Sequence, residues 1–264
     1  MSALAPQRRA QIAEQVQLTG GVRVSELTRL FGVSDMTIRR DLDSLARRGL
    51  IAKVHGGAIR ADPSTEEPTF ASKAVRELTE KDAIAARAAS LVRPGAAIAL
   101  TAGTTTWVLA RHLINVPQLT VVTNSIPVAE RLHESQRQDQ TVILTGGVRT
   151  PSDALVGPVA VATILSLRVD TLFMGVHGAD ARAGLTTPNL MEGETNRAFT
   201  ECARHLVVLA DHTKWGVVGL SQIAALSGVG TFVTDDGIDA DAQSIIANQV
   251  GELIVASVGG RSRS

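Results

Sequence analysis

A segment near the N-terminus, residues 34–42, combines side-chain types that can read DNA bases. As a helix it places Ile38, Leu42 and Leu45 on one apolar stripe, because these residues recur at i, i+4 and i+7. A serine at the N-cap and an acidic first turn predict that the helix begins here. Its first turns would then display a hydroxyl, a thioether and two guanidinium groups to a major groove. The residues that we expect at this surface are Ser34, Met36, Thr37, Arg39 and Arg40.

A shorter predicted helix lies just before this segment. Residues 24–31 have helical spacing with a start at Ser25, and Gly32 with Val33 allows a tight turn between the two helices. Two short helices joined in this way have the spacing of a DNA-binding helix-turn-helix. An ordinary helical hairpin with solvated arginines gives the same pattern, so the residues that follow decide between the two.

Both the next segment and the distribution of charge favour DNA. Residues 49–60 alternate apolar and polar side chains around Gly56-Gly57, which predicts a small β-hairpin able to contact the DNA backbone. Residues 1–60 hold ten Lys or Arg and five Asp or Glu, a surplus of +5, whereas the chain is neutral with 26 of each, so the remainder carries −5. This separation indicates a basic nucleic-acid-binding head on an acidic body. The residues that we expect at phosphates are Arg8, Arg9, Lys53 and His55.

Residues 7–60 resemble the winged helix-turn-helix of the DeoR family of bacterial transcription regulators. The resemblance is carried by an arginine-rich first helix and by three motifs. The motifs are Val24-Ser25-Glu26-Leu27, Val33-Ser34-Asp35-Met36-Thr37-Ile38-Arg39-Arg40-Asp41-Leu42 and Val54-His55-Gly56-Gly57-Ala58. The resemblance implies sequence-specific binding to double-stranded operator DNA. Because symmetric operators are usually met by symmetric oligomers, we expect a homodimer or homotetramer.

The length of 264 residues allows one small and one medium domain. We expect a DNA-binding domain over residues 1–60, a linker over 61–72, where two prolines interrupt polar sequence, an effector domain over 73–258 and a tail over 259–264. The single cysteine excludes an intramolecular disulfide, which fits a reducing compartment. No signal peptide or membrane span is evident, so we expect a cytoplasmic protein.

The body alternates short apolar segments with helical ones. A helix is expected from Thr79, as its cap, towards Pro94-Gly95. Strands are expected over residues 96–100, 119–123, 141–144, 171–175, 205–210, 231–234 and 252–256, and further helices over 105–113, 126–133, 158–167 and 191–203. Apolar strands with helices between them predict an α/β fold, with a mostly parallel sheet covered on both faces.

Small polar turns follow several of these strands. In open α/β sheets ligands collect at the carboxyl ends of the strands, and a glycine with hydroxyl residues at a helix start can hold phosphate. Such turns, joined by a cation at Lys214 or Arg197, would form a pocket for a phosphorylated polyol. The residues that we expect at this site are Gly103, Thr104, Thr105, Thr106, Thr123, Asn124, Ser125, Gly146, Gly147, His177, Gly178, Glu194, Arg197, Asp211 and Lys214.

Residues 73–258 resemble the effector-sensing domain of the same DeoR family. The matching motifs are Ala102-Gly103-Thr104-Thr105-Thr106, Val121-Val122-Thr123-Asn124-Ser125, Leu144-Thr145-Gly146-Gly147 and Asp211-His212-Thr213-Lys214-Trp215-Gly216. The resemblance implies a fold like ribose-5-phosphate isomerase and CoA-transferase, and a phosphorylated-sugar effector. Thr101 stands where the family often has an acidic residue, and Asn196-Arg197 where many members have Lys-Arg. The first departure puts the usual effector in question.

The expected function is that of a DNA-binding regulator of carbohydrate metabolism, a repressor whose DNA affinity a sugar phosphate changes. An activator would use the same parts. The other alternative is an isomerase-like enzyme with Glu194 or Asp211 as base. Because the chain lacks nucleophile-elbow, phosphate-loop, dinucleotide and paired-cysteine zinc motifs, we expect no enzyme, no cofactor and no metal.

Overall fold

The computed structural model describes residues 5–19, 21–47, 50–54, 56–60 and 70–259. The chain divides into two compact units, Met1–Val75 and Arg76–Ser264. The expected linker, 61–72, lies mostly outside the described residues, and its last part from Phe70 begins a short helix, α4 (Phe70–Ala74). The tail from residue 260 also lies outside them.

The N-terminal unit packs three helices against a small antiparallel sheet. Its elements are α1 (Ala5–Thr19), β1 (Gly21–Arg23), α2 (Val24–Phe31), α3 (Asp35–Arg47), β2 (Ile51–Val54) and β3 (Gly57–Arg60), with strand order β1-β3-β2. The predicted stripe of Ile38, Leu42 and Leu45 is buried in its core. The predicted hairpin is confirmed as β2 and β3. The third strand, β1, was not predicted.

Local chemistry explains how these short elements are joined. Gly32 ends α2 with φ 61°, a left-handed conformation that favours glycine, and its N–H bonds to Thr28 O. The predicted cap is confirmed at α3, where Ser34 Oγ accepts from Thr37 N at 3.3 Å. The start of α2 was wrong by one residue, because the helix begins at Val24 after an extended Arg23.

The C-terminal unit is built on a seven-stranded sheet in which every neighbouring pair is parallel. Its order is β15-β14-β12-β9-β4-β5-β6. The strands are β4 (Ala97–Leu100), β5 (Thr120–Thr123), β6 (Thr141–Leu144), β9 (Val169–Gly175), β12 (Ala203–Leu209), β14 (Thr231–Asp235) and β15 (Glu252–Ala256). All seven predicted strands are confirmed to within a few residues. The α/β prediction is therefore correct.

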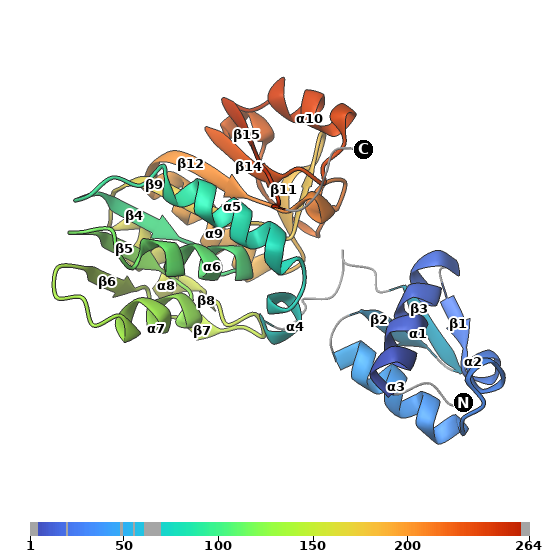
Figure 1. Cartoon of the computed structure of the whole chain (residues 1–264). Coiled ribbons are helices and arrows are strands. Elements are labelled where there is room, and N and C mark those ends of the chain that lie inside the picture. The colour runs from blue at the N-terminus through green and yellow to red at the C-terminus, as the bar shows by residue number, and fades with distance from the viewer. Residues whose placement is uncertain (1–4, 20, 48–49, 55, 61–69, 260–264) are drawn as a thin grey trace. The chain divides into compact units, whose positions relative to one another are not determined.

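Helices cover both faces of this sheet, which explains why its strands are apolar throughout. One face packs on α5 (Leu78–Ala89), α6 (Thr104–Leu113) and α7 (Ile126–Glu134), as Figure 1 shows. The other packs on α8 (Pro158–Leu165), α9 (Leu190–Cys202) and α10 (Ala240–Ala247). The predicted cap of α5 was wrong: the helix begins at Leu78 after Glu77, which has φ 46°, and Thr79 is exposed.

Two smaller elements were not predicted. The antiparallel sheet β10-β11-β13 consists of Gly178–Asp180, Gly184–Thr187 and Ser221–Ala224, and the ribbon β7-β8 consists of Val148–Arg149 and Leu155–Val156. Their strands have two to four residues, too few to show a period in the sequence. Within the described part of the chain, no helix is long and apolar enough to cross a membrane.

Candidate DNA-binding surface and effector site

The exposed face of α3 carries the residues predicted to read bases. Met36 is 61% exposed, and Arg39 and Arg40 are also exposed. The hydroxyls of Ser34 and Thr37 lie 2.9 Å apart and form a hydrogen bond across the first turn. The structure therefore presents one thioether, two hydroxyls and two guanidinium groups together on the first turns of a helix that is free to enter a groove.

The two arginines of α3 differ in their surroundings. Arg39 forms an i,i+4 ion pair with Asp35, and the hydrogen bond that Arg39 donates to this carboxylate raises the pKa of Arg39. Arg40 has no hydrogen bond or ion pair to any residue that the structure describes. Its five N–H groups are therefore all available to DNA.

Arg8 corrects one of the predictions. Its Nε donates to Asp41 Oδ2 at 2.6 Å, and the side chains are only 7% and 9% exposed. Arg9 lies beside it, donating through Nη1 to Ser44 Oγ at 2.9 Å. Both contacts join α1 to α3. We conclude that Arg8 positions the recognition helix, because a guanidinium buried in this way cannot reach a phosphate, whereas Arg9 is partly exposed.

The predicted wing contacts stay predictions. His55 lies outside the described residues, and of Lys53 the structure describes only the backbone in β2. The hairpin does require a glycine at position 57, because a Cβ there would lie 2.2 Å from Val22 O. This is where β3 pairs with β1.

At the carboxyl end of β4, the turn into α6 has the predicted form of an anion cradle. The first helical N–H with a partner is that of Trp107, which bonds to Gly103 O at 3.1 Å, so the N–H groups before it have no helical acceptor. Thr104 and Thr105 are 7% exposed, and neither hydroxyl is used by a residue that the structure describes. Thr106 instead bonds back to Gly103 O at 2.9 Å and is fully buried. The cradle therefore consists of residues 103–105.

The end of β9 lies next to this turn. A Cβ at Gly175 would lie 3.9 Å from the Cα of Gly103, an ordinary van der Waals distance. Thr101 is fully buried, and its Oγ1 accepts from Gly175 N at 3.2 Å. Thr101 therefore ties the end of β4 to the end of β9.

The turn after β5 makes several internal hydrogen bonds. Thr123 Oγ1 donates to Leu100 O at 2.7 Å, and Ser125 Oγ caps α7 by accepting from Val128 N. Asn124 accepts from Ala102 N at 2.9 Å and donates to Leu155 O at 3.0 Å. Asn124 thus holds the cradle turn and the β7-β8 ribbon together. These hydrogen bonds hold the turn in place, and the ligand role of the three residues stays a prediction.

Three predicted glycines have backbone reasons of their own. Gly146 and Gly147 follow β6 with φ 72° and 118°, and a Cβ at Gly147 would lie 2.5 Å from Val156 O. A Cβ at Gly178 would lie 2.1 Å from Val217 O. Positive φ therefore accounts for Gly146, and close packing of backbone accounts for Gly147 and Gly178.

Among the remaining predicted residues, Arg197 lies in the middle of α9 rather than at a strand end. Its Nη1 donates to Gln222 O, on β13, at 2.6 Å. Glu194 is exposed on the same helix, and His177 is partly buried after β9. The neighbouring carboxylate of Glu192, which was not predicted, accepts from Thr150 Oγ1 at 3.1 Å and from Ser152, and so anchors the β7-β8 ribbon to α9.

A buried lysine was missed by sequence reasoning. Lys81, on the first turns of α5, is 3% exposed, and its Nζ donates to Arg76 O. Burial lowers the pKa of Lys81 to about 8, while Asp211 opposes this shift and Lys214 adds to it. Lys81 therefore lies within electrostatic reach of two predicted effector residues. Its spacing in the sequence resembles that of a solvated helix lysine, which is why no signal marked it.

Asp211 follows β12, the neighbour of β9, and is 1% exposed. Its Oδ1 accepts from Thr213 N at 3.2 Å, but its buried Oδ2 accepts no hydrogen bond within the described residues. Burial, with Glu80 and Asp211 nearby, raises the pKa of Glu77. The turn after β4 thus offers N–H groups without helical acceptors. The region after β12 offers Asp211, whose carboxylate has one oxygen unpartnered among the described residues and acts electrostatically on the buried Lys81 of α5.

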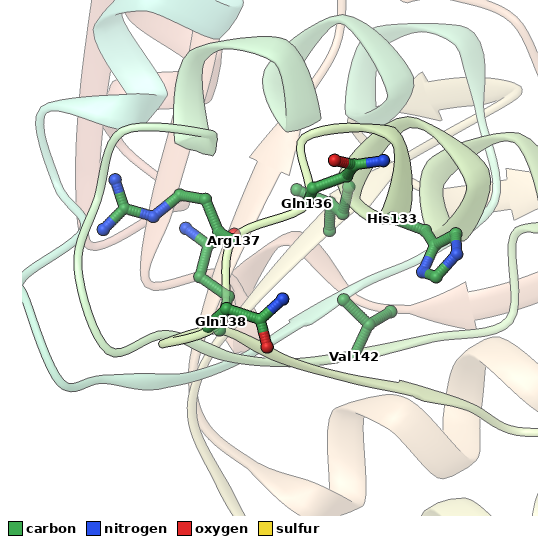
Figure 2. A pocket seen from close by; sticks show the side chains of 7 residues that line it. His133, Gln136, Arg137, Gln138 and Val142 are labelled. Atoms are coloured by element: carbon green, nitrogen blue, oxygen red, sulfur yellow. The ribbon is translucent and has the colours of Figure 1, made fainter.

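The C-terminal unit also has a cavity away from this site. A cavity of about 450 Å³ is lined by residues that precede and begin β6, at the amino ends of the strands. Figure 2 shows Arg137 and His133 on opposite sides of it, and Arg137 is paired with Asp139 at 2.7 Å. None of the predicted effector residues lines it.

Comparison with known proteins identifies the class. The model of a DeoR-like helix-turn-helix domain matches residues 8–64, and that of a DeoR C terminal sensor domain matches residues 76–236. Together with the recognition helix and the strand-end site, these matches define a two-domain, DNA-binding transcription regulator. The chain belongs to the DeoR family.

Full-length relatives agree with this assignment. GlpR, a transcriptional regulator of Haloferax volcanii, is 38% identical over 97% of this chain and 99% of its own length. YgbI, an uncharacterized regulator of Escherichia coli K12, is 38% identical over 95% and 97%. The glycerol-3-phosphate regulon repressor of the same strain is 34% identical over 87% and 90%. These relatives are regulators, which decides against the enzyme alternative.

Solved structures were compared as well. Ribose 5-phosphate isomerase A of Methanocaldococcus jannaschii has a TM-score of 0.38 and 18% identity, covering 51% of this chain and 53% of its own. The family assignment rests on the sequence matches.

Proposed function

We propose that this regulator is a repressor of a carbohydrate-metabolism operon, and that a phosphorylated sugar or polyol bound at the ends of β4, β9 and β12 changes its operator affinity. The printed names of several relatives support the first part, since two are glycerol-3-phosphate regulon repressors and one is a putative aga operon repressor. The operator would be bound by a homodimer or homotetramer.

The observation that carries the effector proposal is the buried Lys81 within electrostatic reach of the buried Asp211. Burial lowers the pKa of the Lys81 ammonium group, and a bound phosphate would favour its charged form. The open N–H groups of residues 103–105 would bind the same phosphate. The free Oδ2 of Asp211 would accept a hydrogen bond from a sugar hydroxyl.

The test uses the full chain and a fluorescent duplex taken from upstream of its own gene, at one fixed salt concentration. Glycerol 3-phosphate and a panel of pentose and hexose phosphates are titrated, each beside its unphosphorylated parent. A coupling of about 1–3 kcal/mol would change operator affinity by roughly 5- to 150-fold. We expect one phosphorylated compound to have this effect and its parent to have none.

Matched variants locate the site. Lys81→Met should abolish the response to the active compound and leave DNA binding in its absence intact. Arg87→Gln removes a positive charge from the exposed face of the same helix and should respond as the original protein does. Equal loss of response in both variants, or an unchanged response in Lys81→Met, would place the effector elsewhere.

A further inference from the structure

The first turn of α3 holds a carboxylate against one of the arginines assigned to the major groove. Asp35 Oδ1 accepts from Arg39 Nε, and Oδ2 lies 3.5 Å from Nη2. The two side chains are 59% and 52% exposed. The pair therefore lies on the solvent side of the helix, among the residues that would enter the groove.

The contact uses one particular edge of the guanidinium group. Arginine has five N–H groups in a fixed fork, and Asp35 takes the edge formed by Nε and Nη2. Both N–H groups of Nη1 and the outer N–H of Nη2 stay open. That terminal edge is the one that can donate to guanine O6 and N7 together.

The carboxylate of Asp35 suits the positive end of the helix dipole, but its ion pair with Arg39 adds little to stability. An exposed i,i+4 pair contributes little to folding, and an acidic residue on a DNA-binding face repels phosphate. The neighbouring Arg40 is left without a carboxylate among the described residues. Asp35 thus acts on one of the two arginines.

We propose that Asp35 is a specificity-determining residue: it fixes Arg39 so that the terminal edge of the guanidinium meets guanine, and it keeps this side chain from swinging to a phosphate. The inference rests on the proposed base contact by Arg39. It requires that loss of the carboxylate lowers base preference while general affinity for DNA rises.

The test selects binding sites from a randomised duplex library with the full chain and sequences the bound fraction, so no operator need be known. The proteins are the original, Arg39→Ala, Asp35→Asn, the double variant and Glu14→Gln. Glu14 is an exposed acid on α1 and is the charge-matched control. Nonspecific affinity is measured on a random-sequence duplex over a range of salt concentrations.

Arg39→Ala should lose preference for one guanine by about 5- to 150-fold. Asp35→Asn should weaken the same preference by about 2- to 5-fold, the range of an exposed ion pair, and change nothing further once Arg39 is absent. Both Asp35→Asn and Glu14→Gln should bind random DNA more tightly, but Glu14→Gln should keep the original preference.

Two outcomes would overturn the inference, and they are distinct. An unchanged preference in Asp35→Asn, or an equal further loss in the double variant, would remove the role of Asp35 alone. Unchanged preference in Arg39→Ala would remove the underlying base contact. Thermal unfolding of each variant confirms that the compared proteins are folded.

Discussion

The two units of this regulator place their charged side chains in opposite settings. On α3, Asp35 and Arg39 form their pair with more than half of each side chain exposed, whereas Lys81 and Asp211 are 3% and 1% exposed in the sensor unit. Exposed charges are screened by salt. Buried charges are screened less, and burial lowers the pKa of Lys81 to about 8. Salt is therefore the variable that tests the first surface, and pH the variable that tests the second.

The largest expected effect concerns an exception to this contrast, because the N-terminal unit also has a buried ion pair, between Arg8 and Asp41. Arg8→Ala leaves Asp41 buried without its main partner, and we expect a loss of about 3–5 kcal/mol in the stability of that unit. Chemical denaturation followed by circular dichroism measures it. Arg29→Ala, at an exposed site on α2, should change stability by less than about 0.5 kcal/mol. Similar losses in both variants would show that Arg8 is not structural.

The next effect concerns the exposed surface. Arg40→Ala should cost about 1–3 kcal/mol on the preferred duplex and relax base preference, because all of its N–H groups are available to bases. Lys53→Ala should weaken all sequences alike and reduce the salt slope by about one. Anisotropy on preferred and random duplexes at several salt concentrations checks both. Parallel losses on both duplexes for both variants would contradict this division of roles.

The buried lysine predicts a dependence on pH. Its folded pKa is lowered to about 8, so it is charged at pH 7 and mostly neutral at pH 9. If a phosphate needs the ammonium form, effector affinity should fall about tenfold between these values, or about 1.4 kcal/mol. Asp211, Lys214, Glu77 and Arg76 face the same group. Calorimetric titration at both pH values measures the change.

Lys81→Met provides the control for that pH dependence. Its effector binding should be weak and nearly flat across the same range, because the titrating group is gone. A fall of similar size in Lys81→Met would assign the dependence to another group.

The smallest effect sharpens the contrast between the two kinds of ion pair. Asp35→Asn should change the stability of the N-terminal unit by less than about 0.5 kcal/mol, because its pair is exposed. The same denaturation measurement used for Arg8→Ala gives the comparison. A loss approaching that of Arg8→Ala would show that Asp35 has a structural role and would weaken its assignment to DNA recognition.

Much of the fold could be predicted because its signals are local. The strands of the main sheet are unbroken apolar runs such as residues 141–144, and the cap at Ser34 depends on a side chain and the next turn. Strands β10, β11 and β13 are too short for the sequence to show an alternation of apolar and polar residues. Glu77 was beyond prediction as the residue before α5, because a non-glycine residue with positive φ has no sequence signature.

The site was harder to predict, because a sequence shows which groups are present but not which are already paired. Thr105 and Asn124 both stand in polar turns after strands, yet Asn124 has hydrogen bonds to Ala102 and Leu155, whereas no residue that the structure describes uses the hydroxyl of Thr105. Arg8 and Arg9 are adjacent, and only burial separates their roles. The burial of Lys81 could not be predicted from the sequence, because it depends on which face of α5 packs inward.

The hydrogen bond from Lys81 to the carbonyl of Arg76 has a mechanical consequence. Arg76 is the first residue of the sensor unit, so the Lys81 ammonium group holds the chain in place at the start of that unit. A phosphate bound to Lys81 would share the ammonium group with the carbonyl of Arg76, and would strengthen or weaken that hydrogen bond. The effector and the first residue of the sensor unit would then be coupled through five residues of one chain, without any contact through the sheet.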